Sequence, residues 1–258
     1  MQSAEQYVQA QLESLFDLDC ERVREGAEKS ADLTASSKSG ERFIVEVKTL
    51  HPRSPRGPDR DGFFVYEDPW FERSSAGTAV KKAAKQIRQT SASHYEDSVG
   101  LLWLMSVDDD EAEFRLDQAL GELLGLRGVV CSWPDQESAV HIRCIGAKPS
   151  RFERHPEIAG AIVAYPDPPG GVQLFVNPYS PKAQALRKTD VARKFASYRA
   201  VVDPAIITEA SQGYLVCETT VDRRNDREII EYLKERFRLN DAHMCDFKRY
   251  SSAVLVRR

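Results

Sequence analysis

Residues 42–48 of the 258-residue chain read Arg42-Phe43-Ile44-Val45-Glu46-Val47-Lys48. Such a run of β-branched and aromatic residues predicts a strand. Because successive side chains of a strand point to opposite faces of its sheet, Ile44, Glu46 and Lys48 share one face. Two opposite charges at the end of an apolar strand are costly to bury unless they pair with each other or bind a metal ion. The segment therefore predicts a strand that ends in an ion pair or a metal site.

A second acidic residue precedes this strand across a predicted turn. Residues 36–40 read Ser-Ser-Lys-Ser-Gly, which is typical of a hairpin turn between the apolar segments 31–35 and 42–50. We expect these segments to form antiparallel strands, which would bring the carboxylate of Asp32 beside that of Glu46. Two carboxylates with an ammonium group beside them would provide a site for a hard cation. Magnesium held there would polarise a phosphodiester and activate a water molecule.

The Glu-x-Lys triplet is weak support when taken by itself. Average composition predicts about one such triplet by chance in a chain of this length, and the chain contains one, at residues 46–48. The context carries the prediction instead, because the triplet lies on an apolar strand that follows an Asp-bearing strand. A structural ion pair on an ordinary strand remains the alternative.

Further helices and strands surround these two segments. Apolar residues recur at helical spacing over residues 4–16, with Ser3 as a candidate N-cap, and again over residues 78–90. Residues 99–107 predict a strongly apolar strand. The long segment 51–77 is rich in Pro, Gly and Arg, and loops of this length are usually functional or disordered.

The second half of the chain predicts a mixture of helices and strands. We expect a helix at 115–127, strands at 128–133 and 139–145, a strand–turn–strand unit at 158–177, and a strand, a helix (227–237) and a strand within 201–258. These patterns predict an α/β protein with one domain over residues 1–200 and a small C-terminal α/β region over residues 201–258.

The order helix, strand, strand with Glu-x-Lys, helix, strand resembles the core of the PD-(D/E)XK nuclease superfamily, the restriction-endonuclease-like proteins. The likeness is closest to the Holliday-junction-resolvase and Mrr-like branches and covers about residues 4–107. The motif aspartate matches Asp32, and the motif Glu-x-Lys matches Glu46-Val47-Lys48, whereas Ala31 stands where the pattern usually has proline. The resemblance implies a restriction-endonuclease-like core with a central mixed β-sheet flanked by helices.

The resemblance also implies a metal-dependent nuclease that uses Mg²⁺ or Mn²⁺ to hydrolyse phosphodiester bonds, with DNA as the expected substrate. Asp32, Glu46 and the carbonyl of Val47 would ligate the metal. Lys48 would position or activate the attacking water and stabilise the pentavalent phosphorus.

Two further residues match the pattern by position and would support the site. Glu5 lies on the predicted first helix, on a stripe with Val8, Leu12 and Leu15 that would turn its carboxylate inward. Gln86 lies on the helix that follows the Glu-x-Lys strand. Both have ordinary interpretations as well, since a first-turn glutamate favours the helix dipole and glutamine is a good helix former.

Other functions remain open at this point. The main rival is a catalytically inactive protein with the nuclease fold that acts as a binding subunit of a defence or repair complex. A third possibility is a metal-dependent hydrolase of another phosphoester, and a homodimer or a protein partner is compatible with each. Basic residues within 81–88 and 182–199 would either contact phosphates or form solvated helix faces. Segments 51–77 and 108–157 would be insertions that leave the substrate open.

The composition limits the remaining classes of protein. A formal net charge of −4 excludes a globally basic nucleic-acid coat protein, but not a local positive surface. No apolar run approaches the roughly 18 residues of a membrane span, and residues 1–5 lack a signal-peptide pattern, so we expect a cytoplasmic protein without a membrane partner. The five cysteines lack metal-site spacing, and no glycine-rich phosphate loop is present. Neither a structural zinc nor ATP hydrolysis is therefore expected.

Overall fold

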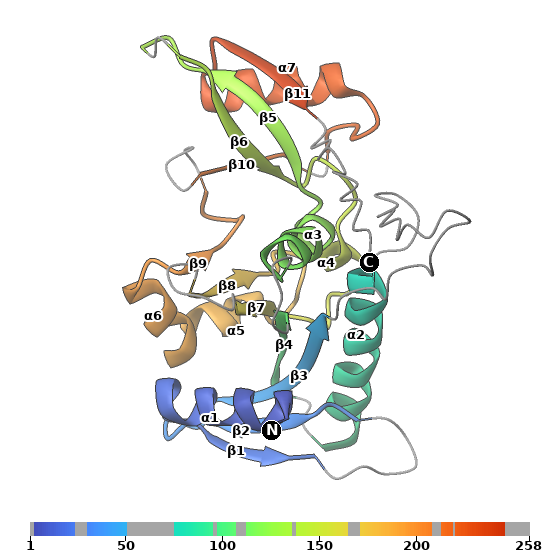
Figure 1. The fold of residues 1–258 in the computed structure, drawn as a ribbon, viewed down its shortest axis with the longest axis vertical. Helices are drawn as coiled ribbons and strands as arrows, with labels where there is room; N and C mark the ends of the chain where they lie inside the picture. Colours follow the sequence, from blue (N-terminus) through green and yellow to red (C-terminus); the bar gives the residue numbers. More distant parts are fainter. Residues whose placement is uncertain are drawn as a thin grey trace, which may run out of the picture.

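The computed structural model describes residues 3–23, 30–50, 75–94, 97–106, 112–135, 138–164, 171–207, 213–218 and 220–245. The first elements along the chain are α1 (Ala4–Phe16), β1 (Asp19–Arg22), β2 (Leu33–Ser36), β3 (Arg42–Leu50), α2 (Ser75–His94), β4 (Val99–Ser106) and α3 (Ala112–Leu124). Those that follow are β5 (Arg127–Ser132), β6 (Val140–Ile145), α4 (Arg151–Arg154), β7 (Gly160–Ala164), β8 (Val172–Val176), α5 (Ala183–Lys188), α6 (Asp190–Ser197), β9 (Val201–Val202), β10 (Tyr214–Val216), α7 (Asp226–Phe237) and β11 (Asp241–Cys245) (Figure 1).

The larger of two sheets carries the Glu-x-Lys strand near its centre. Its strands lie in the order β1-β2-β3-β4-β7-β8-β9. β3, β4 and β7 run parallel to one another, and β2 pairs antiparallel with β3. Helix α2 connects β3 to β4 because parallel neighbours need a crossover connection. The predicted antiparallel pairing of segments 31–35 and 42–50 is confirmed, except that β2 begins at Leu33, so that Asp32 lies one residue before the strand.

Helices cover both faces of this sheet (Figure 1). On one face, residues of α1, α5 and α6 form a core with side chains such as Val45. On the other face, residues of α2, α3 and α4 form a second core with side chains such as Ile44. The alternation of β3 thus supplies both cores, as its sequence pattern requires. The predicted α/β fold with a central mixed sheet flanked by helices is confirmed at this level.

The first helix begins at the predicted cap. The Ser3 hydroxyl accepts a hydrogen bond from the Gln6 backbone N–H at 3.3 Å, and the Gln6 side chain accepts one from the Ser3 backbone N–H at 2.9 Å. These two bonds form a capping box, which satisfies two backbone donors at once. The predicted inward stripe was wrong at Leu15, which is 40% exposed. Phe16 fills that end of the core instead, stacked on Phe195 with ring centroids 5.0 Å apart.

The predicted helix at 115–127 ends earlier than expected. Gly125 adopts a positive φ of 63°, a left-handed conformation that ends α3 at Leu124. A side chain at this glycine would collide with the Lys148 carbonyl oxygen, which lies 2.1 Å from an added Cβ position. The chain therefore turns directly into β5, so that residues 125–127 are not helical as predicted.

The smaller sheet has the strand order β10-β6-β5-β11, with α7 packed against it. Its strands come from two parts of the chain, 127–145 and 214–245. The expected insertion at 108–157 and the expected C-terminal region at 201–258 therefore share this sheet, although β9 joins the larger one. One hydrophobic core connects both sheets. A division of the chain at residue 200 stays a prediction.

Some expected features fall outside the described residues. Residues 51–74 of the long segment rich in Pro and Gly are among them, and α2 starts at Ser75, three residues before the predicted helix start. Within the described ranges, no helix combines the length and apolar character that crossing a membrane requires.

Candidate functional site

Asp32 lies beside Glu46 because β2, which begins directly after Asp32, pairs with β3. Asp32 immediately precedes β2, whose first residue, Leu33, pairs with Val45 of β3. Continuing this antiparallel register by one residue sets Asp32 opposite Glu46. The Asp32 backbone N–H donates a hydrogen bond to Glu46 Oε2 over 3.2 Å. The carboxylate of Glu46 thus holds the start of β2 in place.

A second hydrogen bond runs in the opposite direction. Asp32 Oδ2 accepts the backbone N–H of Val47 at 2.8 Å. The carboxylate of Asp32 therefore binds the backbone of β3, and that of Glu46 binds the backbone of Asp32 just before β2. Because the N–H and C=O of one strand residue point to the same side, the Val47 carbonyl lies at the strand edge that faces Asp32. This arrangement brings the three predicted metal ligands, Asp32, Glu46 and Val47, into one place.

Lys48 shares the face of β3 on which Glu46 lies. Its Nζ forms a salt bridge with Glu46 Oε1. The Glu46 side chain is fully buried, whereas that of Lys48 is 20% exposed. The pair therefore extends from the core toward solvent, with the ammonium group at its outer end.

Burial opposes the negative charge of both acids. It raises the pKa of Glu46 to about 7; the charge of Lys48 opposes this rise and that of Asp32 adds to it. Burial also raises the pKa of Asp32, although the Val47 N–H and the Lys48 charge act against the rise. One ammonium group thus faces two carboxylates that lack full solvation. A further cation would favour the ionised form of both acids.

Helix α2 anchors the segment that leads into Asp32. Gln86 Nε2 donates a hydrogen bond to the Ser30 carbonyl oxygen at 2.9 Å. One turn later, the buried Thr90 hydroxyl oxygen accepts the Ala31 backbone N–H at 2.8 Å. The structure therefore gives Gln86 a contact with the backbone before Asp32. Thr90 was not predicted, and its position four residues after Gln86 on one helix face could have identified it.

Glu5 lies on α1, which packs on the opposite face of the sheet from α2. Its pKa is lowered, first by the side-chain hydrogen bond with Ser3 and to a smaller extent by the charges of Arg22 and Lys48. Its own charge contributes to the raised pKa of Asp32. Glu5 therefore acts on the site electrostatically, and among the described residues no hydrogen bond or salt bridge joins it to Asp32, Glu46 or Lys48.

The donor set suits a particular kind of metal ion. Within the described part of the chain, no group of three or more His, Cys, Asp or Glu side chains is placed to hold a metal ion. Two carboxylates and a backbone carbonyl would leave most of a coordination shell to other ligands. Magnesium is commonly bound in this way, through one or two carboxylates together with waters and substrate phosphate oxygens. The residues present therefore fit Mg²⁺ or Mn²⁺ shared with a phosphate-containing substrate, but not a cation enclosed by protein ligands alone.

The functional groups around Asp32 and Glu46 determine which chemistry this site supports. It combines two carboxylates, one ammonium group and a backbone carbonyl at a strand edge. Carboxylates of raised pKa next to a specific charge partner are typical of functional sites, although structural ion pairs produce the same shift.

No protein-family model matches the chain, and neither the curated proteins nor the solved structures contain a significant match.

Proposed function

We propose that this protein is a nuclease that depends on Mg²⁺ or Mn²⁺ and hydrolyses phosphodiester bonds, with DNA as the substrate. The observation that carries the proposal is the reciprocal bonding of Asp32 and Glu46, with Lys48 bound to Glu46. A fully buried glutamate beside a half-buried aspartate is costly to maintain, and a bound metal ion would offset this cost. The preference for DNA rests on the resemblance to PD-(D/E)XK nucleases.

Each residue has a defined task in this proposal. Asp32 and Glu46, with the Val47 carbonyl, hold the cation, which when bound polarises the phosphodiester and activates water. The Lys48 ammonium group orients the attacking water and stabilises negative charge on the phosphoryl oxygens. Gln86 and Thr90 keep Asp32 in register by binding the backbone of Ser30 and Ala31.

We infer further that residues 4–106 form a restriction-endonuclease-like core. The order α1, β2, β3, α2, β4, with β1 inserted between α1 and β2, supports this inference. The parallel pairing of β3 with β4 on one side and its antiparallel pairing with β2 on the other support it as well. The smaller sheet lies outside this core. Its four strands and α7 are additions to the proposed core of residues 4–106.

A substrate panel tests the function directly. Purified protein is incubated with supercoiled, linear, branched and single-stranded DNA and with RNA, in Mn²⁺ and in EDTA. We expect cleavage of at least one DNA form in Mn²⁺ and none in EDTA. Cleavage of another phosphoester in place of every nucleic acid would retain the metal site but overturn the substrate.

If the protein is instead a catalytically inactive binding subunit, we expect a different result with the same substrates. Such a protein would bind nucleic acid or a partner without cutting, and Glu46→Gln would leave that binding unchanged. Retained binding without cleavage, together with no response to Mn²⁺, would replace the nuclease by this interpretation.

A further inference from the structure

A cavity of about 310 Å³ lies where the two sheets meet, apart from the Asp32–Glu46 region. Its lining comes from the ends of α3, β6 and β10, from the start of α4 and from the segments that follow β8 and β9. No residue of β2, β3 or α2 lines it. The volume is at the lower end of the range for small-molecule sites, roughly 300–1,000 Å³. A cavity of this volume accommodates a ligand that consists of about one substituted ring.

A buried asparagine fixes one wall of this cavity. Asn177 Nδ2 donates to the carbonyl oxygens of Phe152, His155 and Ile158, over 3.2, 3.3 and 2.7 Å. Its Oδ1 accepts the backbone N–H of Tyr179 at 3.0 Å. One side chain therefore connects two lining residues, Phe152 and Tyr179. Because buried polar groups are costly unless they are satisfied, such a network specifies one geometry.

A buried ion pair fixes the wall formed by residues 203–205. Arg187 Nε donates to Asp203 Oδ2 over 2.6 Å, and its Nη2 donates to Oδ1 over 3.0 Å. Asp203 Oδ1 also accepts the backbone N–H of Ala205 at 3.1 Å. The Asp203 side chain is 3% exposed. This wall is therefore held in place before any ligand arrives, as expected of a preformed binding site.

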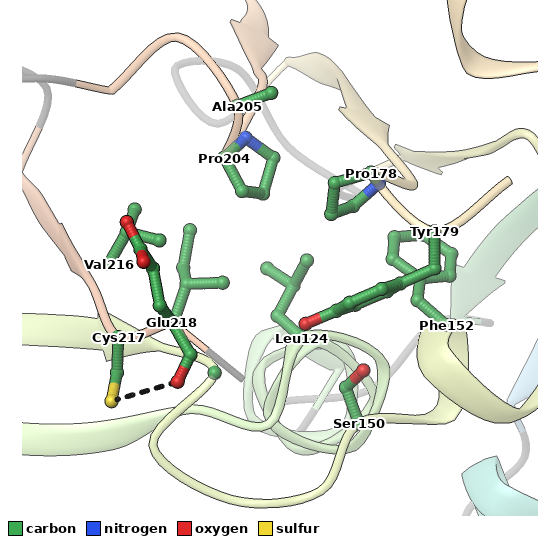
Figure 2. A pocket seen from close by; sticks show the side chains of 12 residues that line it. Leu124, Ser150, Phe152, Pro178, Tyr179, Pro204, Ala205, Val216, Cys217 and Glu218 are labelled. Atoms are coloured by element: carbon green, nitrogen blue, oxygen red, sulfur yellow. Dashed lines mark hydrogen bonds between the residues drawn. The ribbon is translucent and has the colours of Figure 1, made fainter. Parts of the chain in front are cut away.

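Two hydroxyl groups face the otherwise mainly apolar interior. Figure 2 shows the Tyr179 side chain reaching into the cavity, with its hydroxyl near Leu124 and Ser150. Burial raises the pKa of the Tyr179 hydroxyl, against the effect of the nearby Arg223, and the Ser150 oxygen accepts the Glu153 backbone N–H at 3.0 Å. Each hydroxyl group still has its own proton to donate. The cavity therefore offers hydrogen-bond donors to a ligand.

The charges around the cavity are neutralised within the protein. Arg223 pairs with Glu153, and Arg236 pairs with Glu218 at the rim. Burial raises the pKa of the lining thiol of Cys217 to about 11, so the thiol is uncharged at neutral pH. A charged ligand would lose its hydration without a free counter-charge among the lining residues that the structure describes, which is unfavourable. The electrostatics therefore favour an uncharged ligand.

We propose that this cavity binds an uncharged, largely apolar molecule of one-ring size that carries a carbonyl oxygen, which accepts a hydrogen bond from the Tyr179 hydroxyl. Leu124, Phe152 and Val216 contact the apolar body of the ligand. The exposed residues Ala205 and Glu218 form the rim through which the ligand enters. This binding site is independent of the proposed nuclease activity.

Three probes of similar shape separate the parts of this proposal. Acetophenone is uncharged and has a carbonyl acceptor, ethylbenzene lacks the acceptor, and benzoate is charged. Their dissociation constants are measured by calorimetric titration of the full chain. We expect acetophenone to bind about 3- to 10-fold more tightly than ethylbenzene, the range that one neutral hydrogen bond provides, and benzoate to bind more weakly than acetophenone.

Two variants and one control assign the binding to this cavity. Tyr179→Phe removes the donor but keeps the ring, so acetophenone should lose its advantage over ethylbenzene. Ala205→Trp places a large side chain at the exposed rim and should weaken both probes. The control Tyr198→Phe changes a tyrosine that is 72% exposed and should change neither dissociation constant. Circular dichroism and thermal unfolding establish that each variant is folded.

Three results would overturn the proposal. Failure of acetophenone to bind at its solubility limit would remove the site. Tighter binding of benzoate than of acetophenone would contradict the electrostatic argument. An unchanged preference for acetophenone in Tyr179→Phe would show that the hydroxyl is not the donor.

Discussion

The Asp32 carboxylate binds the backbone of β3, and the Glu46 carboxylate binds the backbone of Asp32, one residue before β2. The Asp32 backbone N–H binds Glu46 Oε2 at 3.2 Å, and Asp32 Oδ2 binds the Val47 backbone N–H at 2.8 Å. Both carboxylates thereby continue the pairing of β2 and β3 beyond its last backbone pair, Leu33 with Val45. Removing either acid is therefore expected to change local structure as well as chemistry, so isosteric amide variants are the appropriate tests.

The first prediction concerns the dependence of stability on pH. The pKa of Glu46 in the folded protein is about 7, above its ordinary value of 4.5. The folded state therefore binds a proton more tightly than the unfolded state, so this residue stabilises the fold most below pH 4.5 and loses that contribution as the pH rises through 7. The full shift corresponds to about 3 kcal/mol.

The measurement is urea unfolding between pH 5 and pH 8. Relative to Glu46→Gln, wild type should lose free energy of unfolding from pH 5 to about 7, and the difference should level off toward pH 8. Glu13→Gln, a change on the exposed face of α1, should follow wild type. Parallel curves for wild type and Glu46→Gln would show that Glu46 does not titrate in this range.

The second prediction concerns metal binding. Mn²⁺ at 100 times its dissociation constant should stabilise the folded protein by about 2.7 kcal/mol through mass action. At one fixed Mn²⁺ concentration, the stabilisation should be larger at pH 8 than at pH 6, because protons compete with the metal for Asp32 and Glu46. Thermal unfolding with and without Mn²⁺ measures it. Asp32→Asn and Glu46→Gln should lose the stabilisation, and its persistence in the double variant would place the metal elsewhere.

The third prediction concerns the anchors on α2. Gln86→Ala removes one hydrogen bond to the Ser30 carbonyl and should lower the free energy of unfolding by about 1 kcal/mol. Thr90→Val leaves the buried Ala31 N–H without its hydroxyl acceptor and should cost about 1–3 kcal/mol. Both variants should also slow DNA cleavage by shifting Asp32. Lys85→Ala, an exposed change on the same helix, provides the control for helix stability.

The fourth prediction concerns the buried asparagine. Asn177→Ala leaves three carbonyl oxygens and one N–H without their side-chain partner, so we expect a loss of about 3 kcal/mol or more. Urea unfolding measures the loss, with Asn240→Ala at an exposed position as the control. Equal midpoints for the two variants would contradict the role assigned to Asn177.

Local patterns were sufficient to predict the part of the fold around the candidate site. The alternation of residues 42–48, the turn at 36–40 and the cap at Ser3 are each encoded by a few neighbouring residues, and the elements they predict are present. The approach of Asp32 to Glu46 follows from the same hairpin register. These features involve short sequence separations, where strand and turn geometry leave few alternatives.

The long-range features could not be read from local patterns. The pairing of β10 with β6 and of β11 with β5 joins segments about 70 and 110 residues apart along the chain, and no periodicity encodes a partner at that distance. The Thr90 contact with Ala31 and the Asn177 network are tertiary in the same sense. The contact of Phe16 with Phe195, which leaves Leu15 exposed, joins residues about 180 positions apart and is tertiary as well.

The central claim is tested most directly by comparing two lysine variants. Lys48→Ala removes the ammonium group beside Glu46, whereas Lys38→Ala removes an exposed lysine that pairs with Asp17. With the best DNA substrate in Mn²⁺, Lys48→Ala should cleave at least about 100-fold more slowly than wild type, the loss typical of a group that stabilises transition-state charge. Lys38→Ala should cleave at the wild-type rate. Metal-dependent cleavage that survives unchanged in Lys48→Ala would place the active site elsewhere and contradict the account.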